Sequence, residues 1–360
     1  MRGLAYLLKD VRPVSTELAP AAQARLDHLT KPLGSLGRLE SIARSLVCLY
    51  GRMDIRIRRK VIFTFAADHG IAEESVSLYP RSVTGQMVQN FLSGGAAVNV
   101  LARQAGADLC IVDAGILEPV ASSSGKLKLV QKRIGPGTKN FLNEDAMSRR
   151  EAVRAIESGA DVFFEEYKKN AIDVAGVGDM GIGNSSSAAA MLSVFLNRPP
   201  KDIAGRGTGL DDEGLERKAA VIGRALHGRK PDANDPVDVL AKVGGFEIGE
   251  MAGCFLAGAA RRTAVLVDGF ISTAAAVLAI RLCPAVRDYL FFSHRSAEGG
   301  HALALTDLGV NPLIDLGMRL GEGTGAAMGM HVLDCAAAIF GEMATFDSAG
   351  VSKSGVVKPA

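Results

Sequence analysis

Five short apolar runs, each ending in a polar or glycine-rich turn, constrain the fold of this chain most strongly. The runs are rich in β-branched and aromatic residues, which favour buried strands. Longer stretches with helical spacing of apolar residues separate them. Strand, crossover helix and strand in alternation predict a parallel sheet that is covered by helices on both faces. The predicted strands are residues 61–65, 109–112, 172–175, 263–267 and 289–292, and the main predicted helices are 83–104, 149–168, 188–196, 215–226 and 272–282.

Each predicted strand ends in a turn that carries Asp, His or Ser. In open α/β sheets, ligands bind outside the carboxyl ends of the strands. Asp and Gly also favour turns and helix caps for structural reasons, and for a single strand that interpretation is the better one. Five such turns together predict a binding site along one edge of the sheet. The polar turn residues are Asp68, His69, Asp113, Asp179, Asp268, Ser293 and His294.

Composition argues against several classes of protein. Hydrophobic residues make up 48% of the 360 residues, enough for a folded core. Lys and Arg number 41 against 39 Asp and Glu, and the net charge of +2 argues against a binder of nucleic acid or of anionic membranes. The 5 cysteines are scattered without a CxxC pair, which favours a reducing compartment over a disulfide framework or a zinc site.

Targeting and membrane segments are not expected. The apolar run near the N-terminus is too short for a signal peptide. The longest apolar stretches, residues 188–196 and 269–280, fall short of the ~18 residues that a membrane span needs. We therefore expect a cytoplasmic protein.

The two ends of the chain lack strand patterns. Residues 1–30 and 325–346 have helical character, and we expect them to pack together as a small helical domain. The predicted domains are a large α/β domain at 31–325 and a small helical domain formed by 1–30 with 326–360. A stretch at 126–133 alternates basic and apolar residues and predicts an exposed amphipathic strand or loop.

Two glycine-rich loops are candidates for binding a phosphate. The loop at 176–187 follows a strand and opens an Ala-rich helix, where Asn184 or Ser185 caps the helix and backbone N–H groups face an anion. The loop at 205–209 adds Arg206, and the following helix carries Lys218. These two cations either neutralise a phosphate or belong to a solvated turn and a surface helix, and the pattern alone favours neither interpretation.

A third glycine-rich loop, residues 319–325, places Glu322 between two glycines before an apolar helix. Glycines keep bulk away from a side chain that a ligand must reach. Such a carboxylate acts as a general base if burial raises its pKa toward neutrality. The alternative interpretation is a carboxylate that the helix macrodipole favours at a helix start.

Two further segments have both a structural and a functional interpretation. Residues 77–96 place Tyr79, Met87 and Phe91 where they line either a flat apolar pocket, with Gln86 as its polar handle, or simply the core. Residues 293–301 hold two histidines and a Glu. We do not expect a metal site there, because the histidines lack the spacing of known zinc motifs.

Several ordered motifs over nearly the whole chain resemble the nicotinate-nucleotide:dimethylbenzimidazole phosphoribosyltransferase family. A family resemblance of this kind is far more specific than any single loop. The motifs are Leu-Thr-Lys-Pro-Leu-Gly-Ser-Leu-Gly-Arg-Leu-Glu at 29–40, Asp-His-Gly at 68–70, Val-Thr-x-Gln-Met-Val-x-Asn-Phe at 83–91, Gly-Gly-Ala-Ala at 94–97, Gly-Ile-Gly-Asn at 181–184, Gly-Arg-Gly-Thr-Gly at 205–209, Ser-His at 293–294 and Arg-Leu-Gly-Glu-Gly at 319–323.

The resemblance implies a Rossmann-like open parallel sheet covered by helices, with a small helical domain from the two termini, in a homodimer. It implies transfer of the 5-phosphoribosyl group from nicotinate mononucleotide to 5,6-dimethylbenzimidazole, for the nucleotide loop of cobalamin. No cofactor and no metal are expected. The family's general base corresponds to Glu322. The implied substrate-binding residues are Gln86, Tyr79, Asp179, Gly181, Gly183, Asn184, Arg206, Gly207, Thr208, Lys218, Ser293, Ser296, Leu320, Gly321 and Gly323.

The chain departs from the family pattern at one position. The family usually has Glu-Met-Gly-Ile-Gly-Asn followed by threonines, whereas this chain has Asp179 in place of the Glu and serines at 185–187. The carboxylate is one methylene shorter, which leaves room for a water between it and a substrate. We expect activity to be retained because Glu322 is intact.

Two alternatives belong to other functional classes. A metal-dependent hydrolase would use Asp68, His69, Asp268 and His294, and its activity would be lost with a chelator. A non-catalytic nucleotide-binding protein would have no turnover for a Glu322 variant to lose. The Gly-Glu-Gly loop argues against this second alternative, because a pure phosphate binder does not need a base there.

Overall fold

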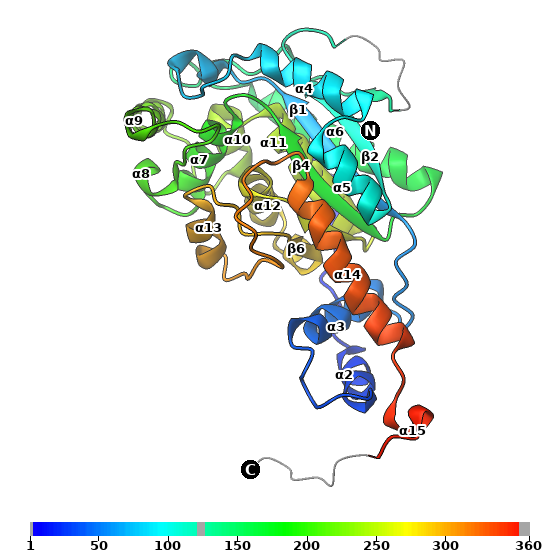
Figure 1. Cartoon of the computed structure of the whole chain (residues 1–360). Helices are drawn as coiled ribbons and strands as arrows, with labels where there is room; N and C mark the ends of the chain where they lie inside the picture. Colours follow the sequence, from blue (N-terminus) through cyan, green and yellow to red (C-terminus); the bar gives the residue numbers. More distant parts are fainter. Residues whose placement is uncertain (1–2, 121–126, 353–360) are drawn as a thin grey trace. The chain divides into compact units, whose positions relative to one another are not determined.

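The computed structural model describes residues 3–120 and 127–352, and the contacts divide the chain into two compact units (Figure 1). The larger unit holds Met1–Pro13 and Arg59–Met330, and the smaller holds Val14–Arg58 and His331–Ala360. The helices are α1 (Leu4–Asp10), α2 (Ala19–His28), α3 (Arg38–Tyr50), η1 (Gly70–Glu74), α4 (Ser82–Ser93), α5 (Ala97–Ala105), α6 (Arg149–Lys169), α7 (Asn184–Phe195), α8 (Pro200–Ile203), α9 (Asp212–Arg229), α10 (Pro236–Val243), α11 (Phe246–Ala260), α12 (Phe270–Leu282), η2 (Pro284–Tyr289), α13 (His301–Asp307), α14 (Thr324–Glu342) and α15 (Phe346–Ala349).

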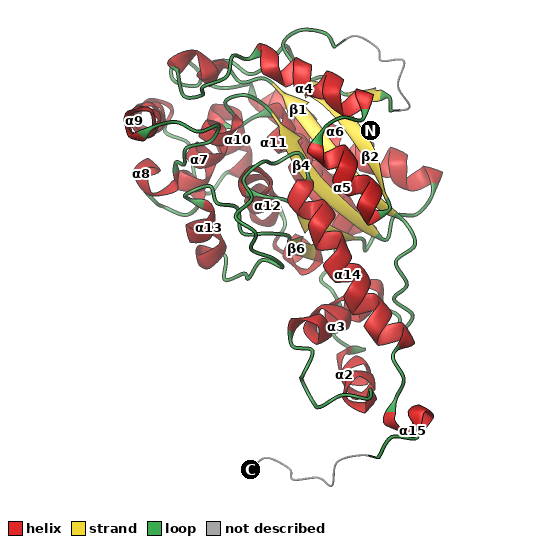
Figure 2. Ribbon diagram, in the orientation of Figure 1, coloured by secondary structure: helices red, strands yellow, loops and turns green. Residues whose placement is uncertain are grey.

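The larger unit is built on a parallel sheet of six described strands in the order β3-β2-β1-β4-β5-β6. Helices cover both faces of this sheet (Figure 2). The predicted α/β class and its five strands are confirmed, and the sixth strand lies in the amphipathic stretch at 126–133. The strands are β1 (Lys60–Ala67), β2 (Ala107–Gly115), β3 (Leu129–Gln131), β4 (Val174–Met180), β5 (Ala264–Val267) and β6 (Leu290–Phe292).

Side chains alternate between the two faces of the sheet along β1, so neighbouring residues contact different elements. Phe63 lies on one face, and its ring packs against Phe163 of α6 with 5.8 Å between the ring centroids. Thr64 lies on the other face, where its hydroxyl donates a hydrogen bond of 2.7 Å to the carbonyl of Glu322. The loop that carries the candidate base therefore lies directly on the central strand.

Strand β4 is longer than predicted. Residues 176–180 were assigned to a phosphate loop, but they continue the strand to Met180, and the loop proper is limited to 181–183. The glycines in this strand provide close approach rather than flexibility. A Cβ on Gly178 would lie 2.1 Å from the backbone nitrogen of Gly323.

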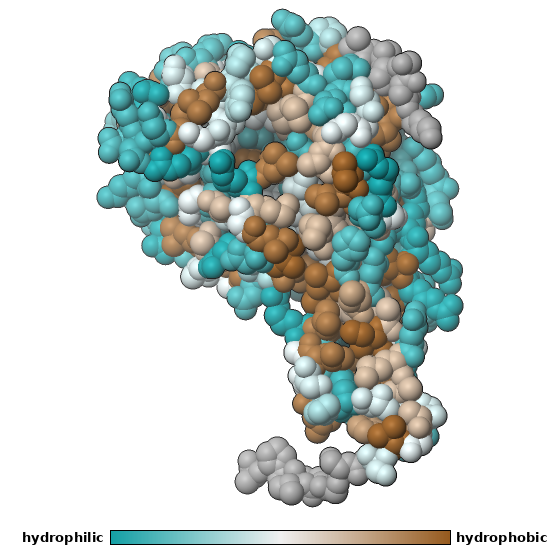
Figure 3. All heavy atoms as spheres, in the orientation of Figure 1, coloured by the Kyte–Doolittle hydropathy of each residue, from teal (hydrophilic) through white to brown (hydrophobic). Residues whose placement is uncertain are grey.

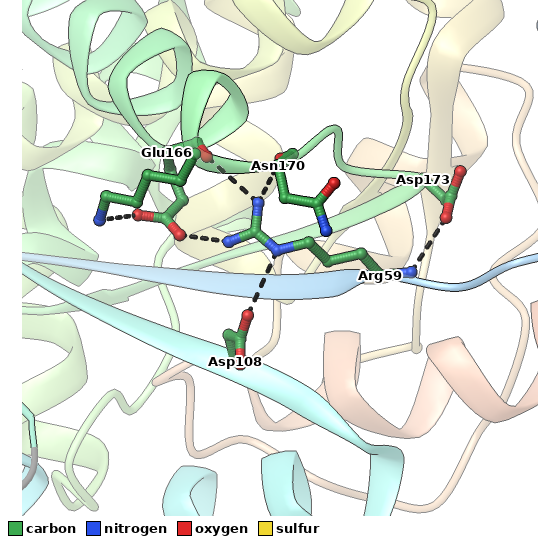
Figure 4. Close-up of polar contacts among 6 residues, drawn as sticks. Arg59, Asp108, Glu166, Asn170 and Asp173 are labelled. Carbon is green, nitrogen blue, oxygen red and sulfur yellow. Dashed lines mark hydrogen bonds and ion pairs between the residues drawn. The ribbon is translucent and has the colours of Figure 1, made fainter.

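Arg59 joins the amino-terminal edge of the sheet to α6 (Figure 4). Its backbone N–H donates to the Asp173 carboxylate at 2.9 Å, and its guanidinium forms an ion pair with Asp108 of β2 at 3.4 Å. The same guanidinium pairs with the Glu166 carboxylate and donates to the Asn170 carbonyl at the end of α6. This cluster is at the edge of the sheet opposite the strand ends at which a site was predicted.

The smaller unit contains α2, α3 and the second part of α14. Within it, the Arg25 guanidinium donates to the Phe340 carbonyl at 2.7 Å, and Lys31 pairs with Glu40 at 2.9 Å. This grouping has different bounds from the predicted domains. Helix α3 packs on α2 and so joins the smaller unit, whereas α1 contacts α6 and α11 of the larger one. The Leu4 amide, for example, donates to Glu157 of α6 at 2.8 Å.

Helix α14 is long and apolar enough to cross a membrane, and 56% of its most apolar 18-residue segment is buried inside the protein. The prediction that no stretch reaches this length is wrong for this helix, because its apolar character is spread over alanines interrupted by small and polar residues. Apolar side chains are visible along part of α14 on the face drawn in Figure 3. One such helix is weak evidence for a membrane, since a core helix can be equally long and apolar.

Candidate functional site

A cavity of about 290 Å³ lies at the carboxyl ends of β4, β5 and β6. Its walls come from the turns that follow these strands, from the loops at 205–209 and 319–321, and from the segment before α4. Ten of the residues predicted from the sequence line it. They are Tyr79, Asp179, Gly181, Gly183, Asn184, Gly207, Thr208, Ser296, Leu320 and Gly321.

Three predicted site residues, Gln86, Arg206 and Ser293, do not line this cavity. Gln86 lines a second cavity of about 310 Å³ next to Asp68. The Arg206 guanidinium is directed to the Leu210 carbonyl at 2.8 Å and to the Asp212 carboxylate. Ser293 is fully buried, and its hydroxyl donates to the Val267 carbonyl at 2.7 Å. The side chains of Arg206 and Ser293 are therefore hydrogen-bonded to other groups of the protein and not directed into the cavity.

The Gly321–Gly323 loop has an unusual backbone. Glu322 adopts a φ of 65°, between Gly321 at 85° and Gly323 at 99°. A positive φ is strained for a residue with a side chain and persists only when the surroundings hold it in place. Here the Glu322 amide donates to the Asp179 carbonyl at 3.0 Å. Strand β4 thus fixes the position of Glu322.

The Glu322 carboxyl group is buried beside the start of α5. It is 4% exposed, and its Oε2 accepts a hydrogen bond of 3.3 Å from the Val98 amide. Burial raises the pKa of Glu322 above its ordinary value, and the Val98 N–H opposes this shift. The side chain is not itself a wall of the cavity, although its neighbours Leu320 and Gly321 are. A raised pKa is what a carboxylate needs to accept a proton near neutral pH.

Two other buried carboxyl groups lie beside this loop. Asp179 accepts a hydrogen bond from the Asn184 side chain at 2.8 Å, and burial, followed by the charges of Asp268 and Glu247, raises its pKa well above the ordinary value. Asp268 accepts from the amides of Gly323 at 3.1 Å and of Ala326 at 2.9 Å. Burial raises the pKa of Asp268 to about 7. Because buried like charges repel, this edge favours protonated carboxyl groups.

Lys218 extends from α9 to Ser185, a residue of the cavity wall. It is fully buried, and its ammonium donates to the Ser185 hydroxyl and to the Gly205 carbonyl, both at 2.9 Å. Burial lowers its pKa to about 8. The interpretation as a surface lysine is wrong, because Lys218 lies behind Ser185, which lines the cavity.

The turn that follows β6 supplies His294, which was predicted at this edge of the sheet, and Glu298, which was not assigned to the binding site. His294 and Glu298 both line the cavity. Burial lowers the pKa of His294, and its Nδ1 has no hydrogen-bond partner among the residues described. The Ser296 amide donates to Nδ1 of His301 at 2.9 Å, so the other ring nitrogen donates to Thr273. The signal available for Glu298 was the concentration of polar residues at 293–301, from which only Ser293, His294 and Ser296 were predicted at the site.

Three of the four residues of the metal-hydrolase alternative, Asp68, His69 and Asp268, are hydrogen-bonded to other groups. Of the four, only His294 lines the cavity, and its Nδ1 has no partner in the described part of the chain. His69 contacts the Ser187 hydroxyl at 2.9 Å and the Glu247 carboxylate at 2.7 Å. Asp68 accepts from the Leu117 amide at 2.7 Å. Over 3–120 and 127–352, no group of three or more His, Cys, Asp or Glu side chains is placed to hold a metal ion. The structure therefore does not assemble the ligand set that this alternative requires.

Comparisons with known proteins agree with the resemblance found in the sequence. A family model described as phosphoribosyltransferase matches residues 11–351. Two relatives carry the name nicotinate-nucleotide–dimethylbenzimidazole phosphoribosyltransferase. The one from Desulforudis audaxviator is 51% identical over 354 residues, covering 98% of this chain and 99% of the relative. The one from Geobacter metallireducens is 48% identical over 353 residues, with the same coverage.

A solved structure is also similar. The crystal structure of CobT from Thermus thermophilus superposes with a TM-score of 0.89 at 42% identity, covering 94% of this chain and 100% of that one. Sequence and fold therefore agree over nearly the full length. The chain belongs to the nicotinate-nucleotide–dimethylbenzimidazole phosphoribosyltransferase family.

Proposed function

We propose that this chain transfers the 5-phosphoribosyl group of nicotinate mononucleotide to 5,6-dimethylbenzimidazole, giving α-ribazole 5′-phosphate and nicotinate for the nucleotide loop of cobalamin. One observation carries the proposal. The cavity has a buried carboxyl group of raised pKa, Glu322, next to one wall and a buried ammonium, Lys218, behind another. A base and a cation, each beside a residue of the cavity wall, match an acceptor that must lose a proton and a donor that carries a phosphate.

The chemistry requires little beyond a base and alignment. The pyridinium of the donor is already a cationic leaving group, so no acid is needed to expel it. One nitrogen of the benzimidazole attacks the anomeric carbon with inversion, while Glu322 takes the proton from the other nitrogen. A well-placed base contributes about 10²–10⁴-fold to the rate. Holding the two substrates in line supplies much of the remainder.

The phosphate and ribose are assigned to the loops around Lys218. The loop at 181–183 precedes α7, which begins at Asn184 and whose first amides and positive dipole end favour an anion. Ser185 and Gly207 line the same part of the cavity, and Lys218 donates to the Ser185 hydroxyl. A phosphate there would receive hydrogen bonds from backbone amides and a hydroxyl that a buried cation polarises.

The benzimidazole is assigned to the wall formed by Tyr79 and Leu320. Both side chains are more than half exposed in this structure, at 54% and 57%. Large exposed apolar side chains beside a cavity are suited to cover a flat aromatic base. Gln86 keeps its proposed role as a polar contact to the base, although it lines the neighbouring cavity.

The proposal includes a homodimer in the cytoplasm, as the family resemblance implies. The mass of the full chain in solution tests the oligomeric state directly. A species of twice the chain mass at micromolar concentration supports the dimer, and a monomer at that concentration contradicts it.

The reaction itself is tested by product analysis. The purified chain is incubated with nicotinate mononucleotide and 5,6-dimethylbenzimidazole, with and without a chelator, and products are separated by liquid chromatography and identified by mass. We expect α-ribazole 5′-phosphate and nicotinate in equal amounts under both conditions. Absence of both products contradicts the proposal. Release of nicotinate with free ribose phosphate, only when metal is present, would instead support a metal-dependent hydrolase.

A further inference from the structure

Glu298 brings a negative charge to the end of the cavity that is assigned to the phosphate. Its two carboxylate oxygens accept from the Gly207 amide at 2.9 and 3.1 Å, and the residue is only 7% exposed. The neighbouring loop makes space for this carboxylate. A Cβ on Gly205 would lie 2.2 Å from the Glu298 Oε1, so a side chain at 205 would displace the carboxylate.

The carboxylate of Glu298 also acts on the buried cation of the site. Its charge raises the pKa of Lys218, against the larger lowering effect of burial. In the absence of a ligand, Glu298 therefore serves as a counterion at the phosphate end of the cavity. A carboxylate with two oxygens on a backbone N–H presents the same acceptor chemistry as a phosphate oxygen.

A phosphate dianion and this carboxylate cannot share the Gly207 amide. Each is an anion, and repulsion between like charges is strong in a partly buried site with low dielectric. The backbone of Glu298 holds the turn without the carboxylate. Its amide donates to the Ser296 hydroxyl, and its carbonyl accepts from the His301 amide. The side chain can therefore leave Gly207 while the turn stays in place.

We propose that Glu298 occupies the phosphate position when the site is empty and is displaced from Gly207 by the phosphate of the nucleotide. This inference rests on the proposed function. Displacement makes binding of any phosphate weaker, and a ligand that also has a ribose and a base to bind compensates for this cost. Free phosphate has no such contacts, so Glu298 keeps its binding weak.

Two variants distinguish this role from the other roles that a carboxylate can have here. Glu298→Gln removes the charge and keeps the shape, and Glu298→Ala frees the Gly207 amide. Inorganic phosphate and nicotinate mononucleotide are titrated into each protein by calorimetry, and nicotinate riboside, which lacks the phosphate, serves as the reference ligand. Glu213→Gln in α9 is the matched control, because the Glu213 side chain is 88% exposed and does not line the cavity.

We expect both Glu298 variants to bind inorganic phosphate at least about tenfold more tightly than the wild type, the size of effect that one neighbouring charge has on an ionic equilibrium. The affinity for the riboside should not change, and the nucleotide should bind more tightly. If Ala weakens phosphate binding and Gln restores it, Glu298 is a brace for the loop and the proposal is wrong. If both variants weaken nucleotide and riboside equally, Glu298 contacts the ribose, and the proposal is also wrong.

The phosphate titration requires no turnover, so it separates this inference from the proposed function. A wild type that fails to form product while its Glu298 variants gain phosphate affinity contradicts the reaction but not the role of Glu298. A wild type that forms product while the variants show unchanged phosphate affinity contradicts only the role of Glu298.

Discussion

The carboxyl groups of Asp179, Asp268 and Glu322 gather where β4 and β5 end, and burial raises the pKa of each. Their hydrogen bonds differ. Asp268 accepts hydrogen bonds from two backbone amides at the start of α14, whereas Glu322 accepts one hydrogen bond, from the Val98 amide. The folded protein thus keeps protons on acidic side chains at pH values where they are ordinarily ionised. This has a consequence for stability as well as for catalysis.

Asp268 makes stability depend on pH in a defined direction. Its pKa is about 7 in the folded protein, against 3.8 ordinarily, so the folded state binds more protons than the unfolded state between these values. Stability from this group is complete below its unfolded pKa and is lost as pH rises through 7, by up to about 1.4 kcal/mol per pH unit. We expect denaturant unfolding to show that the wild type loses stability relative to Asp268→Asn between about pH 5 and pH 7.

The comparison with Asp268→Asn removes this carboxyl group and its effect on the pKa of Asp179, and leaves the other titrating groups in place. A difference in unfolding free energy that stays constant over this range would contradict the raised pKa. A difference that increases with pH in favour of the wild type would contradict its sign.

Replacing Asp179 with the glutamate that the family usually has tests whether this departure from the family pattern matters for activity. The Asp179 carboxyl group is bonded to Asn184 and lies beside Gly321, where a Cβ would be 3.5 Å from Oδ2. We expect Asp179→Glu to keep kcat, because the base is unchanged, and to show its effect in KM, where one methylene is worth about 1–3 kcal/mol. The measurement is kcat and KM for both substrates. A sharp loss of kcat would mean that the shorter side chain is required here.

Part of the site was predictable from the sequence at this scale, and part was not. Glycines and polar residues after apolar runs indicated where Asp179, Asn184 and Gly207 line the cavity. The burial of Lys218 was not predictable, since an amphipathic helix does not reveal which of its charged residues extends inward. Gln86 was expected at the same cavity, but a helix position alone does not show which of two neighbouring cavities a side chain faces.

At the scale of elements, the close contact of β4 with the 321–323 loop holds the candidate base in place. Gly178 lies in the strand, and a Cβ there would be 2.1 Å from the Gly323 nitrogen and 2.5 Å from the Glu322 carbonyl carbon. Both of these neighbours are backbone atoms, so they cannot rotate away. Glycine in the middle of this strand is therefore a requirement of the loop and not of the sheet.

We expect Gly178→Ala to lower kcat by at least about 100-fold, because displacement of a catalytic group by an ångström has an effect of this size. Gly223→Ala in α9 is the control, since nothing lies within 4 Å of its Cβ. Alanine there should stabilise the protein by about 0.5–1 kcal/mol and leave kcat unchanged. Steady-state rates and unfolding curves on both variants provide the test, and a fully active Gly178→Ala protein would contradict the positioning argument.

The extension of β4 shows why elements were only partly predictable. Apolar runs such as 61–65 carry a clear strand pattern, and the structure contains strands at those places. The Gly-Val-Gly segment at 176–178 carries no such pattern and resembled a loop. It is a strand because of long-range pairing with β1 on one side and β5 on the other. Contacts distant in sequence have no local signature.

At the scale of the whole molecule, the order of the strands accounts for the place of the cavity. The order β3-β2-β1-β4-β5-β6 reverses direction between β1 and β4, and in open α/β sheets ligands bind at such a reversal. The cavity lies at β4, β5 and β6, next to that point. The sequence predicted a parallel sheet and a site at its carboxyl edge, but the order is set by which strands pair and could not be read from spacing.

The central claim is that Glu322 is the base of a phosphoribosyl transfer, and the rate of product formation by Glu322→Gln tests it most directly. Glutamine keeps the shape and the acceptor for the Val98 amide but cannot accept a proton. With saturating nicotinate mononucleotide and 5,6-dimethylbenzimidazole, we expect kcat to fall by about 10²–10⁴-fold with little change in KM. Glu213→Gln should match the wild type. A Glu322→Gln protein that forms α-ribazole 5′-phosphate at the wild-type rate would contradict the account.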